Sequence, residues 1–380
     1  MTAGLLGRKL GHSLSPQIHR LFGDYDYRLY ERDPEDMAGF VREFLATADT
    51  GFLNVTIPYK QTVFALCDDL TPIARRLGNV NLVTRTVDGR LLGDNTDAYG
   101  VERLLDSIGA DVRGLNCAIL GAGGVAMTAR AVLESRGAAR VSLVRRGELP
   151  ETDDELIVNA TPVGMFPDVD GRRINIAEFP CCRYVLDLVY NPSPTRLVRE
   201  ARARGKIATD GLVMLIAQGY RAACLGGSMG TEGNLYLYGP PASGKSTLAR
   251  QIASATGWPL VDLDAEIVRT EGREIAAIFA TEGEKVFREI ERRELERIAA
   301  GSGQVVALGG GALLDAACRH TADASGRVVV LDCPIETLKS RLTGADRPLS
   351  ADAARLEALV AARAAHYASF PVHVQMTTAR

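Results

Sequence analysis

The chain has 380 residues, of which 24% are charged and 46% hydrophobic, and its formal net charge at pH 7 is -3. Because a single hydrophobic core stops growing at about 250 to 300 residues, this length predicts two or three globular domains. A net charge so close to zero gives no basic surface for nucleic acid or for a membrane, so we expect neither as a partner.

The seven cysteines form no C-x-x-C pair and no spacing typical of a zinc site or of a disulfide framework. The first residues, MTAGLLGRKLGHSLSP, lack the long apolar core of a secretory signal. No apolar run approaches the roughly 20 residues that a membrane-spanning helix needs. We therefore expect a cytoplasmic protein with reduced cysteines.

A helix is predicted at PQIHRLF, residues 16–22, because proline is favoured at the first position of a helix. Ser13 and Ser15 stand just before this proline, where a hydroxyl commonly caps the first amide groups. His12 and His19 flank the same stretch without metal-ligand spacing. We interpret both histidines as local packing or hydrogen-bonding residues.

A strand, a glycine-rich turn, a helix and a second strand follow one another in the segments LNCAIL, GAGGVA, MTARAVLESRG and RVSLV. This is the order of a dinucleotide-binding fold, in which amide groups at the start of the helix bind a pyrophosphate. A purely structural turn is the alternative. The residues expected to bind the cofactor at this turn are Gly121, Ala122, Gly123, Gly124 and Val125.

The second strand ends in LVRRG, so Arg145 and Arg146 stand where an NAD-binding fold has a carboxylate for the ribose hydroxyls. A guanidinium group suits a 2′-phosphate, because it is planar and always charged. The sequence therefore favours NADP over NAD. Two solvated surface arginines are the alternative.

The composition changes at CLGGSMGTEGN, residues 224–234, where Gly, Ser and Thr replace a helical pattern. We place the main domain boundary there. The next segment, LYLYG, predicts a short buried strand that enters a glycine-rich loop. A glycine-rich join of this kind predicts two separable units.

The loop GPPASGKS, from Gly239 to Ser246, fits the phosphate-loop pattern G-x-x-x-x-G-K-[ST]. In such a loop the amide groups and Lys245 bind the phosphates of a nucleotide, while the hydroxyl of Ser246 binds Mg²⁺. The residues expected to bind this second nucleotide are Gly239, Gly244, Lys245, Ser246 and Thr247. The chain thus carries two phosphate-binding turns of different design.

The segments GHSLSPQIH, NVTIPYK, GDNTDAYG, VNATPVGM, VLDLVYNP and GLVMLIAQG occur in this order. Together they make residues 1 to about 225 resemble shikimate dehydrogenase. Reduction of a ketone needs a proton donor and a group that holds that donor. The resemblance implies Lys60 as the donor and Asp97 as the group that orients it, whereas each alone would pass for a surface charge.

The resemblance also implies a set of hydroxyl and amide groups that bind the substrate, which suits a small polyhydroxylated acid. These substrate-binding residues are Ser13, Ser15, Thr56, Asn81, Tyr190 and Gln218. The sequence departs from the family at Gly147, where the family has a threonine beside the cofactor phosphate.

The segments LVDLDAEI, EGEKVFREIE, LGGGALL, DRPLS and RAAHY follow the phosphate loop. They make residues 235 to 380 resemble shikimate kinase. The resemblance implies that Asp262 lies near Mg²⁺ and that Asp264 holds or deprotonates the accepting hydroxyl. A turn or a helix cap is the alternative for both aspartates.

Arg288 and Glu291 lie three residues apart on a predicted helix, so they share a face. The resemblance implies that Arg288 and Arg363 bind the substrate carboxylate and that Glu291 holds Arg288. A solvated surface pair is the alternative. The resemblance places three glycines beside the substrate: Gly309, Gly310 and Gly311.

The segment TGADRPLSAD, residues 343–352, resembles the lid of the kinase family, and its Gly, Asp and Pro content suits a mobile loop. Arg347 in this segment would then bring a cation onto the transferring phosphoryl group. Arg341 is a candidate contact for the adenine.

The expected fold is α/β throughout: a two-lobed dehydrogenase with a Rossmann-like NADP lobe, followed by a phosphate-loop kinase. The expected substrate lobe comprises residues 1–100, with residues 212–225 returning to it. The NADP lobe comprises residues 101–211, the linker residues 226–234, and the kinase residues 235–380. The oligomeric state stays open.

The expected activities are reduction of 3-dehydroshikimate with NADPH, and then phosphorylation of shikimate with ATP and Mg²⁺. One alternative is a quinate-accepting dehydrogenase joined to another small-molecule kinase. A second alternative is a metabolite sensor or repressor built from such domains without catalysis, although no basic DNA-reading segment accompanies it.

Overall fold

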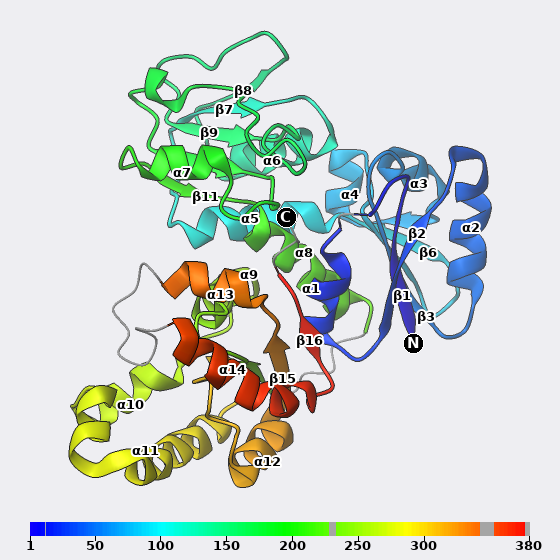
Figure 1. Ribbon diagram of the computed structural model, residues 1–380. Coiled ribbons are helices and arrows are strands. Elements are labelled where there is room, and N and C mark those ends of the chain that lie inside the picture. The colour runs from blue at the N-terminus through cyan, green and yellow to red at the C-terminus, as the bar shows by residue number, and fades with distance from the viewer. Residues whose placement is uncertain (12, 228–232, 343–352, 377–380) are drawn as a thin grey trace.

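The computed structural model describes residues 1–11, 13–227, 233–342 and 353–376. Three sheets with flanking helices follow one another along the chain, and each is the centre of an α/β layer structure (Figure 1). This arrangement agrees with the two or three domains that the length predicts.

The N-terminal sheet has the strand order β2-β1-β3-β5-β6-β4. Strand β1 is parallel to β2 and β3, whereas β5 is antiparallel to both β3 and β6. The strands are β1 (Thr2–Gly7), β2 (Asp26–Glu31), β3 (Thr50–Val55), β4 (Asp69–Leu70), β5 (Leu82–Arg85) and β6 (Leu91–Asp94). The helices are α1 (Ser15–Phe22), α2 (Pro34–Ala46), α3 (Lys60–Leu66) and α4 (Pro72–Leu77).

The middle sheet is parallel throughout and has the order β11-β10-β9-β7-β8. Its strands are β7 (Asn116–Leu120), β8 (Arg140–Val144), β9 (Leu156–Asn159), β10 (Tyr184–Asp187) and β11 (Ile207–Thr209). Its helices are α5 (Thr96–Ser107), α6 (Gly124–Ser135), η1 (Ile176–Glu178) and α7 (Arg196–Arg202). The predicted strand, turn, helix and strand are confirmed as β7, the glycine turn, α6 and β8, since parallel neighbours need a crossover helix.

Helix α8 (Leu212–Leu225) follows the middle sheet but packs against α5 and α1. Two glycines permit this close packing. A Cβ atom at Gly100 would lie 3.0 Å from the carbonyl oxygen of Met214, and one at Gly219 would lie 2.7 Å from Ile18 Cγ2. Because glycine has no Cβ atom to clash at either position, α8 can pack closely against α5 and against α1, the first helix of the chain.

The C-terminal sheet is also parallel and has the order β13-β14-β12-β15-β16. Its strands are β12 (Asn234–Tyr238), β13 (Leu260–Asp262), β14 (Val305–Ala307), β15 (Gly326–Leu331) and β16 (His373–Val374). Its helices are α9 (Lys245–Thr256), α10 (Leu263–Glu271), α11 (Ile275–Ala299), α12 (Ala316–Ser325), α13 (Ile335–Leu342) and α14 (Ala353–Ala368).

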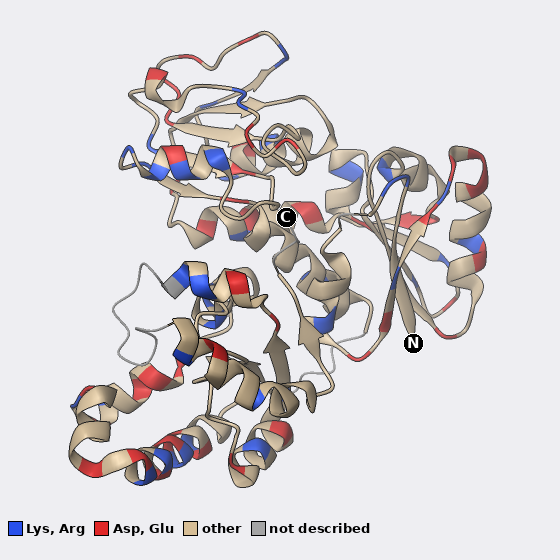
Figure 2. Cartoon of the chain, in the orientation of Figure 1, with Lys and Arg blue, Asp and Glu red and all other residues tan. Residues whose placement is uncertain are grey.

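Helix α11 departs from helical geometry at Gly283, where φ is 81°. Basic and acidic side chains alternate along this helix, so its outer surface carries charges of both signs (Figure 2). In the part of the chain that the structure describes, we find no helix long and apolar enough to cross a membrane.

The units built around the three sheets are in contact with one another. Helix α9 of the C-terminal sheet packs against α5 and α8, and β16 packs against α1 (Figure 1). The glycine-rich join predicted two separable units. The described residues on either side of that join share a packed interface, and the separability of the two activities stays a prediction. Residues 228–232 of the join lie outside the described residues.

Candidate functional sites

Lys60 and Asp97 form an ion pair at the edge of the N-terminal sheet. Lys60 Nζ donates to Asp97 Oδ2 at 2.5 Å. The side chains are largely buried, with exposed fractions of 18% for Lys60 and 5% for Asp97. Asp97 lies in the first turn of α5, where the positive end of the helix dipole favours a carboxylate, and the Asn95 side chain caps this helix.

The strand directions explain why these groups meet. Strand β3 ends just before Thr56, and Thr56 N donates to the carbonyl of Leu6 at 2.9 Å on the neighbouring parallel strand. Because β5 runs the other way, Asn81 at its start lies at the same edge, where its Oδ1 accepts from Thr96 N at 2.7 Å. The structure therefore brings Thr56, Asn81, Lys60 and Asp97 to one edge of one sheet.

Ser13 and Ser15 lie at the start of α1. Ser13 Oγ donates to Ser15 Oγ at 3.0 Å and accepts from the Ser15 amide at 3.2 Å. The N-cap position of α1 is Leu14, and no side chain caps this helix. Neither serine is therefore the helix cap that the sequence allowed as an alternative.

His19 is buried in an aromatic cluster behind these serines. Its ring stacks on Tyr27 at 3.8 Å between centroids, and its Nδ1 lies 2.6 Å from the Tyr25 hydroxyl. Burial lowers the pKa of His19 to about 3, although a hydrogen bond with Asn54 acts in the opposite direction. The interpretation of His19 as a packing and hydrogen-bonding residue is confirmed. His12 lies outside the described residues.

Gln218 and Tyr190 come from other elements. Gln218 lies on α8, which packs against α1, and Tyr190 follows β10. Both side chains are half-buried, and burial raises the pKa of the Tyr190 hydroxyl. Their role in substrate binding stays a prediction.

The glycine turn and the two arginines lie side by side in the middle sheet. Strand β7 leads into Gly121, whose φ of 114° favours glycine, and Gly123 is the N-cap of α6. Gly123 and Gly124 are exposed, and a Cβ atom at either would meet nothing within 4 Å, so the start of α6 is accessible to a ligand. The Gly121 amide donates to the carbonyl of Val144 at 2.9 Å, which places the next residue, Arg145, beside the turn.

A third arginine, Arg173, holds the loop that carries Arg145 and Arg146. Its Nη2 donates to the carbonyl oxygens of Arg145 at 2.5 Å and Glu148 at 2.8 Å. Inside the loop, the Arg145 amide donates to Glu148 Oε2 at 2.7 Å, and Gly147 has a φ of 93°. Arg173 lies 28 residues from Arg145 in an irregular segment, so no short-range pattern in the sequence points to it.

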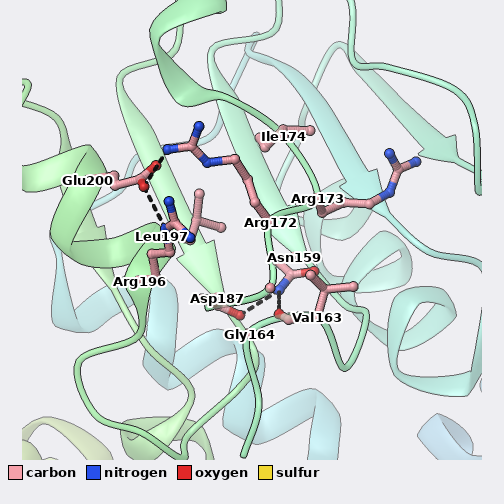
Figure 3. A pocket seen from close by; sticks show the side chains of 11 residues that line it. Asn159, Val163, Gly164, Arg172, Arg173, Ile174, Asp187, Arg196, Leu197 and Glu200 are labelled. Atoms are coloured by element: carbon pink, nitrogen blue, oxygen red, sulfur yellow. Dashed lines mark hydrogen bonds and ion pairs between the residues drawn. The ribbon is translucent and has the colours of Figure 1, made fainter. Parts of the chain in front are cut away.

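A small cleft beside this loop is lined by charged and polar side chains that bond to one another (Figure 3). Arg172 and Arg196 both donate to Glu200 Oε1, at 2.6 and 2.8 Å. Asp187 accepts from Asn159 Nδ2 at 2.8 Å, and burial raises the pKa of Asp187 to about 6. Since these groups satisfy one another, we interpret the cleft as structural and not as an anion site.

The phosphate loop follows β12. Gly239 and Gly244 have φ values of 128° and 98°, and Ala242 has a positive φ of 61°. Such alternation turns successive amide groups toward one concave side, which is how a backbone nest binds phosphate. Among the described residues, the buried hydroxyl of Ser243 has no hydrogen-bond partner. The loop therefore fits a nucleotide phosphate.

Lys245 and Ser246 start α9 directly after the loop. Lys245 is buried, and its Nζ donates to the carbonyls of Gly239 at 3.0 Å and Pro240 at 2.7 Å. Ser246 Oγ donates to Asp262 Oδ2 at 2.9 Å. A hydroxyl beside a carboxylate fits Mg²⁺, which commonly takes one or two protein oxygens and completes its shell with phosphate and water.

Asp262 is also the N-cap of α10, where it accepts from the Ala265 amide. The helix cap that the sequence allowed for this aspartate is therefore present, and its other carboxylate oxygen still faces Ser246. In the described ranges, no group of three His, Cys, Asp or Glu side chains is arranged to hold a metal ion.

Gly309 and Gly310 lie between the acids of the site and the phosphate loop. A Cβ atom at Gly309 would lie 3.2 Å from Asp264 Oδ1 and 3.3 Å from Glu291 Oε1. One at Gly310 would lie 3.1 Å from Pro241 of the phosphate loop. Gly309 therefore lies against both acids, Asp264 and Glu291, and the next residue, Gly310, lies against the phosphate loop.

Gly311 lies against the two arginines. A Cβ atom there would lie 3.0 Å from Arg288 Nη2 and 3.3 Å from Arg363 Nη1. Arg288 Nη1 donates to Glu291 Oε2 at 2.6 Å, and Arg363 Nη1 donates to the carbonyl of Gly310 at 3.0 Å. Burial raises the pKa of Glu291, and the positive charge of Arg288 opposes that effect. The buried carboxylate of Glu291 thus holds Arg288, and Arg288 and Arg363 both lie against Gly311.

The sequence also predicted roles for Arg341 and Arg347, of which the structure describes only Arg341. Arg341 Nη1 donates to the carbonyls of Ala242 and Ser243 at 3.2 and 2.8 Å, so it lies against the phosphate loop. Arg347 lies outside the described residues.

A family model described as the shikimate dehydrogenase substrate binding domain matches residues 5–83. A curated shikimate dehydrogenase (NADP(+)) of Clostridium perfringens is 34% identical over 262 residues, which cover 61% of this chain and 96% of that relative. The chain belongs to the shikimate dehydrogenase family. A family model described as shikimate kinase matches residues 241–380, so a kinase domain follows the dehydrogenase in the same chain.

Solved structures support the dehydrogenase match. The shikimate 5-dehydrogenase of Thermus thermophilus, in complex with NADP(H) and shikimate, is 30% identical with a TM-score of 0.54, covering 60% of this chain and 94% of that one. A chorismate mutase/shikimate 5-dehydrogenase fusion protein from Clostridium acetobutylicum is 29% identical with a TM-score of 0.56, covering 61% and 92%. The fold is therefore that of a two-lobed shikimate dehydrogenase followed by a phosphate-loop kinase.

Proposed function

We propose that this enzyme reduces 3-dehydroshikimate to shikimate with NADPH and then phosphorylates shikimate to shikimate 3-phosphate with MgATP. The observation that carries the proposal is the presence of two assembled sites in one chain. The Lys60–Asp97 pair occupies one sheet edge, while Asp264 and two arginines surround three glycines beside a phosphate loop.

In the dehydrogenase site, Lys60 would give a proton to the carbonyl oxygen of the substrate as that oxygen gains negative charge. Asp97 would keep the ammonium group of Lys60 in place and accept a hydrogen bond from a substrate hydroxyl. When bound, NADPH supplies the hydride. The substrate hydroxyls and carboxylate would be bound by Ser13, Ser15, Thr56, Asn81, Tyr190 and Gln218.

In the cofactor site, the amide groups at the start of α6 would bind the pyrophosphate. Arg145 and Arg146 would bind the 2′-phosphate of NADP. The bonds from Arg173 support this assignment, because they hold both arginines on a loop of defined shape before the cofactor arrives. Less ordering is then needed on binding.

In the kinase site, Arg288 and Arg363 would bind the shikimate carboxylate, with Glu291 fixing Arg288. Asp264 would orient or deprotonate the accepting hydroxyl. When bound, MgATP supplies the phosphoryl group, and Lys245, Ser246 and Asp262 are the residues that would hold its phosphates and metal. We propose Arg347 as the lid cation on sequence grounds alone.

We assign residues 1–100 with 212–225 to the substrate lobe, residues 101–211 to the NADP lobe, residues 226–234 to the join and residues 235–380 to the kinase. The packing of α8 against α1 supports the return of residues 212–225. We also propose that the enzyme works in the cytoplasm on small-molecule substrates, without nucleic-acid or membrane partners.

A coupled assay with the purified full chain tests this function. Given 3-dehydroshikimate and NADPH, the enzyme should form shikimate, and added MgATP should convert it to shikimate 3-phosphate. Lys245→Met should stop the reaction at shikimate. Faster turnover of quinate with NAD⁺ would favour the quinate alternative, and turnover of neither acid by folded protein would favour the sensor.

A further inference from the structure

The N-terminal half of helix α8 is covered on every side. Residues 212–217 are six consecutive buried residues, and an α-helix has about 3.6 residues per turn, so no face of this segment meets solvent. Two of the covering helices, α1 and α5, belong to the dehydrogenase, and the third, α9, belongs to the kinase. The kinase therefore completes the burial of a dehydrogenase helix.

The apolar core continues across the same boundary. One cluster of buried side chains includes residues of α5 and α8 together with Leu248, Ala249, Ile252 and Ala255 of α9. It extends to the kinase strands through Leu235 and Leu237. Separating the domains would expose these side chains to water, so the cluster opposes their relative motion.

An arginine of the dehydrogenase caps a kinase helix. The last carbonyls of a helix have no partner inside the helix. Arg103 of α5 donates from Nε to the carbonyl of Ser254 near the end of α9 at 2.9 Å. A guanidinium group there also matches the negative end of the helix dipole.

An arginine of the kinase caps a dehydrogenase helix in the same way. Arg327 of β15 donates to the carbonyls of Arg20 at 3.0 Å and Gly23 at 3.2 Å, at the end of α1. It also pairs with Asp24 at 2.7 Å, and only 11% of its side chain is exposed. Undocking would leave this partly buried cation and these carbonyls without their partners.

These helices carry functional residues at their N-terminal ends. Helix α1 begins at Ser15, α5 begins beside Asp97, and α9 begins at Lys245. The interface therefore joins the C-terminal ends of α1 and α9 and the middle of α5, while the starts of these helices belong to the two sites.

We propose that the dehydrogenase and the kinase form one cooperative unit through this interface, so that a nucleotide bound at the kinase stabilises the dehydrogenase site. The effect rests on the nucleotide site proposed above. A ligand that binds only the folded state stabilises whatever unfolds together with its site. Coupling of this kind is reciprocal, so NADP must stabilise the kinase in turn.

Heat inactivation of the full chain tests the coupling. Samples are heated with or without MgADP, diluted, and assayed separately for each activity. At about 100 times its Kd, MgADP should raise the inactivation midpoint of the dehydrogenase by about 3 °C. NADP⁺ should raise the midpoint of the kinase. Lys245→Met has no kinase activity to follow, and in this variant MgADP should leave the inactivation midpoint of the dehydrogenase unchanged.

The outcomes separate this proposal from the proposed function. If MgADP protects the kinase but leaves the dehydrogenase midpoint unchanged, the cooperative unit is refuted and both activities stand. If MgADP protects neither activity in the wild type, the nucleotide site itself is refuted, and the coupling with it.

The arginine caps supply a second test. In a variant with Arg103→Ala and Arg327→Ala, MgADP should still protect the kinase, while the shift of the dehydrogenase should fall by at least half. Arg113→Ala is the matched control, because Arg113 pairs with Asp111 on the surface. A full shift in the double variant would overturn the role of the caps.

The single tryptophan gives a readout that does not depend on activity. Trp258 follows α9, and its Nε1 donates to the Tyr220 hydroxyl of α8 at 3.3 Å. Its fluorescence should change in one transition that coincides with the loss of both activities and shifts with either ligand. Separate transitions for the two activities would contradict a single unit.

Discussion

Lys60 Nζ lies 2.5 Å from Asp97 Oδ2, although 37 positions separate the two residues in the chain. The carboxylate is almost fully buried, so the ammonium group is its local counter-charge. A proton donor fixed in this way points to the same place in every turnover, which is what general acid catalysis requires.

Replacing Lys60 should remove the proton donor. Lys60→Ala is expected to lower the kcat of dehydroshikimate reduction by roughly 10²- to 10⁴-fold, the usual contribution of a general acid. Phosphorylation of added shikimate should remain. Lys9→Ala, at an exposed position of the same lobe, is the control and should behave as the wild type. Near-normal reduction by Lys60→Ala would remove Lys60 from the mechanism.

Arg146 should determine part of the preference for NADPH. A charge-assisted contact to the 2′-phosphate contributes about 1.5 to 3 kcal/mol, so Arg146→Ala should lower kcat/KM for NADPH by roughly 10- to 150-fold. The value for NADH should change little, because NADH lacks that phosphate. Steady-state kinetics with both cofactors measures the ratio, and a wild-type preference for NADH would refute the assignment.

Arg173 should act on the cofactor through the loop that it holds. Arg173→Ala is expected to raise KM for NADPH several-fold while kcat stays near the wild-type value, because the loop must then be ordered on binding. Arg172→Ala is a matched control, since the neighbouring Arg172 pairs with Glu200 instead. Equal losses with NADPH and NADH would indicate a purely structural role for Arg173.

Glu291 should position Arg288 in the kinase site. Glu291→Gln is expected to raise KM for shikimate by roughly tenfold or more and to leave KM for ATP unchanged, because it weakens a largely buried charge pair worth about 1.5 to 3 kcal/mol. Glu284 offers the matched control: it also pairs with Arg288, at 3.1 Å, but 67% of its side chain is exposed. If Glu284→Gln impaired shikimate binding equally, the special role of Glu291 would be lost.

His19 should make folding stability depend on pH. Burial lowers its pKa to about 3 in the folded chain, whereas the unfolded chain keeps the ordinary value of 6.5. Below pH 6.5 the unfolded state therefore binds the additional proton, and stability falls as the pH falls toward 3. The expected loss from this group between pH 7 and pH 5 is about 2 kcal/mol.

Thermal unfolding at pH 7 and pH 5 measures this effect. His19→Gln should be less stable than the wild type at pH 7, because the stacking on Tyr27 is lost, but its stability should fall less on acidification. An identical fall in both proteins would show that His19 does not titrate on unfolding.

Short-range patterns predicted much of this enzyme. The glycine turn before α6 and the phosphate loop before α9 are recognisable because each consists of neighbouring residues whose spacing follows from backbone geometry. The pairing of Arg288 with Glu291 was also predictable, since residues three apart lie on one face of a helix. The packing of His19 followed from the absence of ligand spacing around it.

Only the tertiary structure shows how the cofactor loop is held and how the dehydrogenase and the kinase are joined. Arg173 reaches Arg145 across 28 positions, Arg103 reaches Ser254 across 151, and Arg327 reaches Arg20 across 307. Each of these arginines binds a backbone carbonyl. Every residue carries such a carbonyl, so the sequence holds no sign of which one an arginine will find, and only the folded arrangement of helix ends and loops selects it.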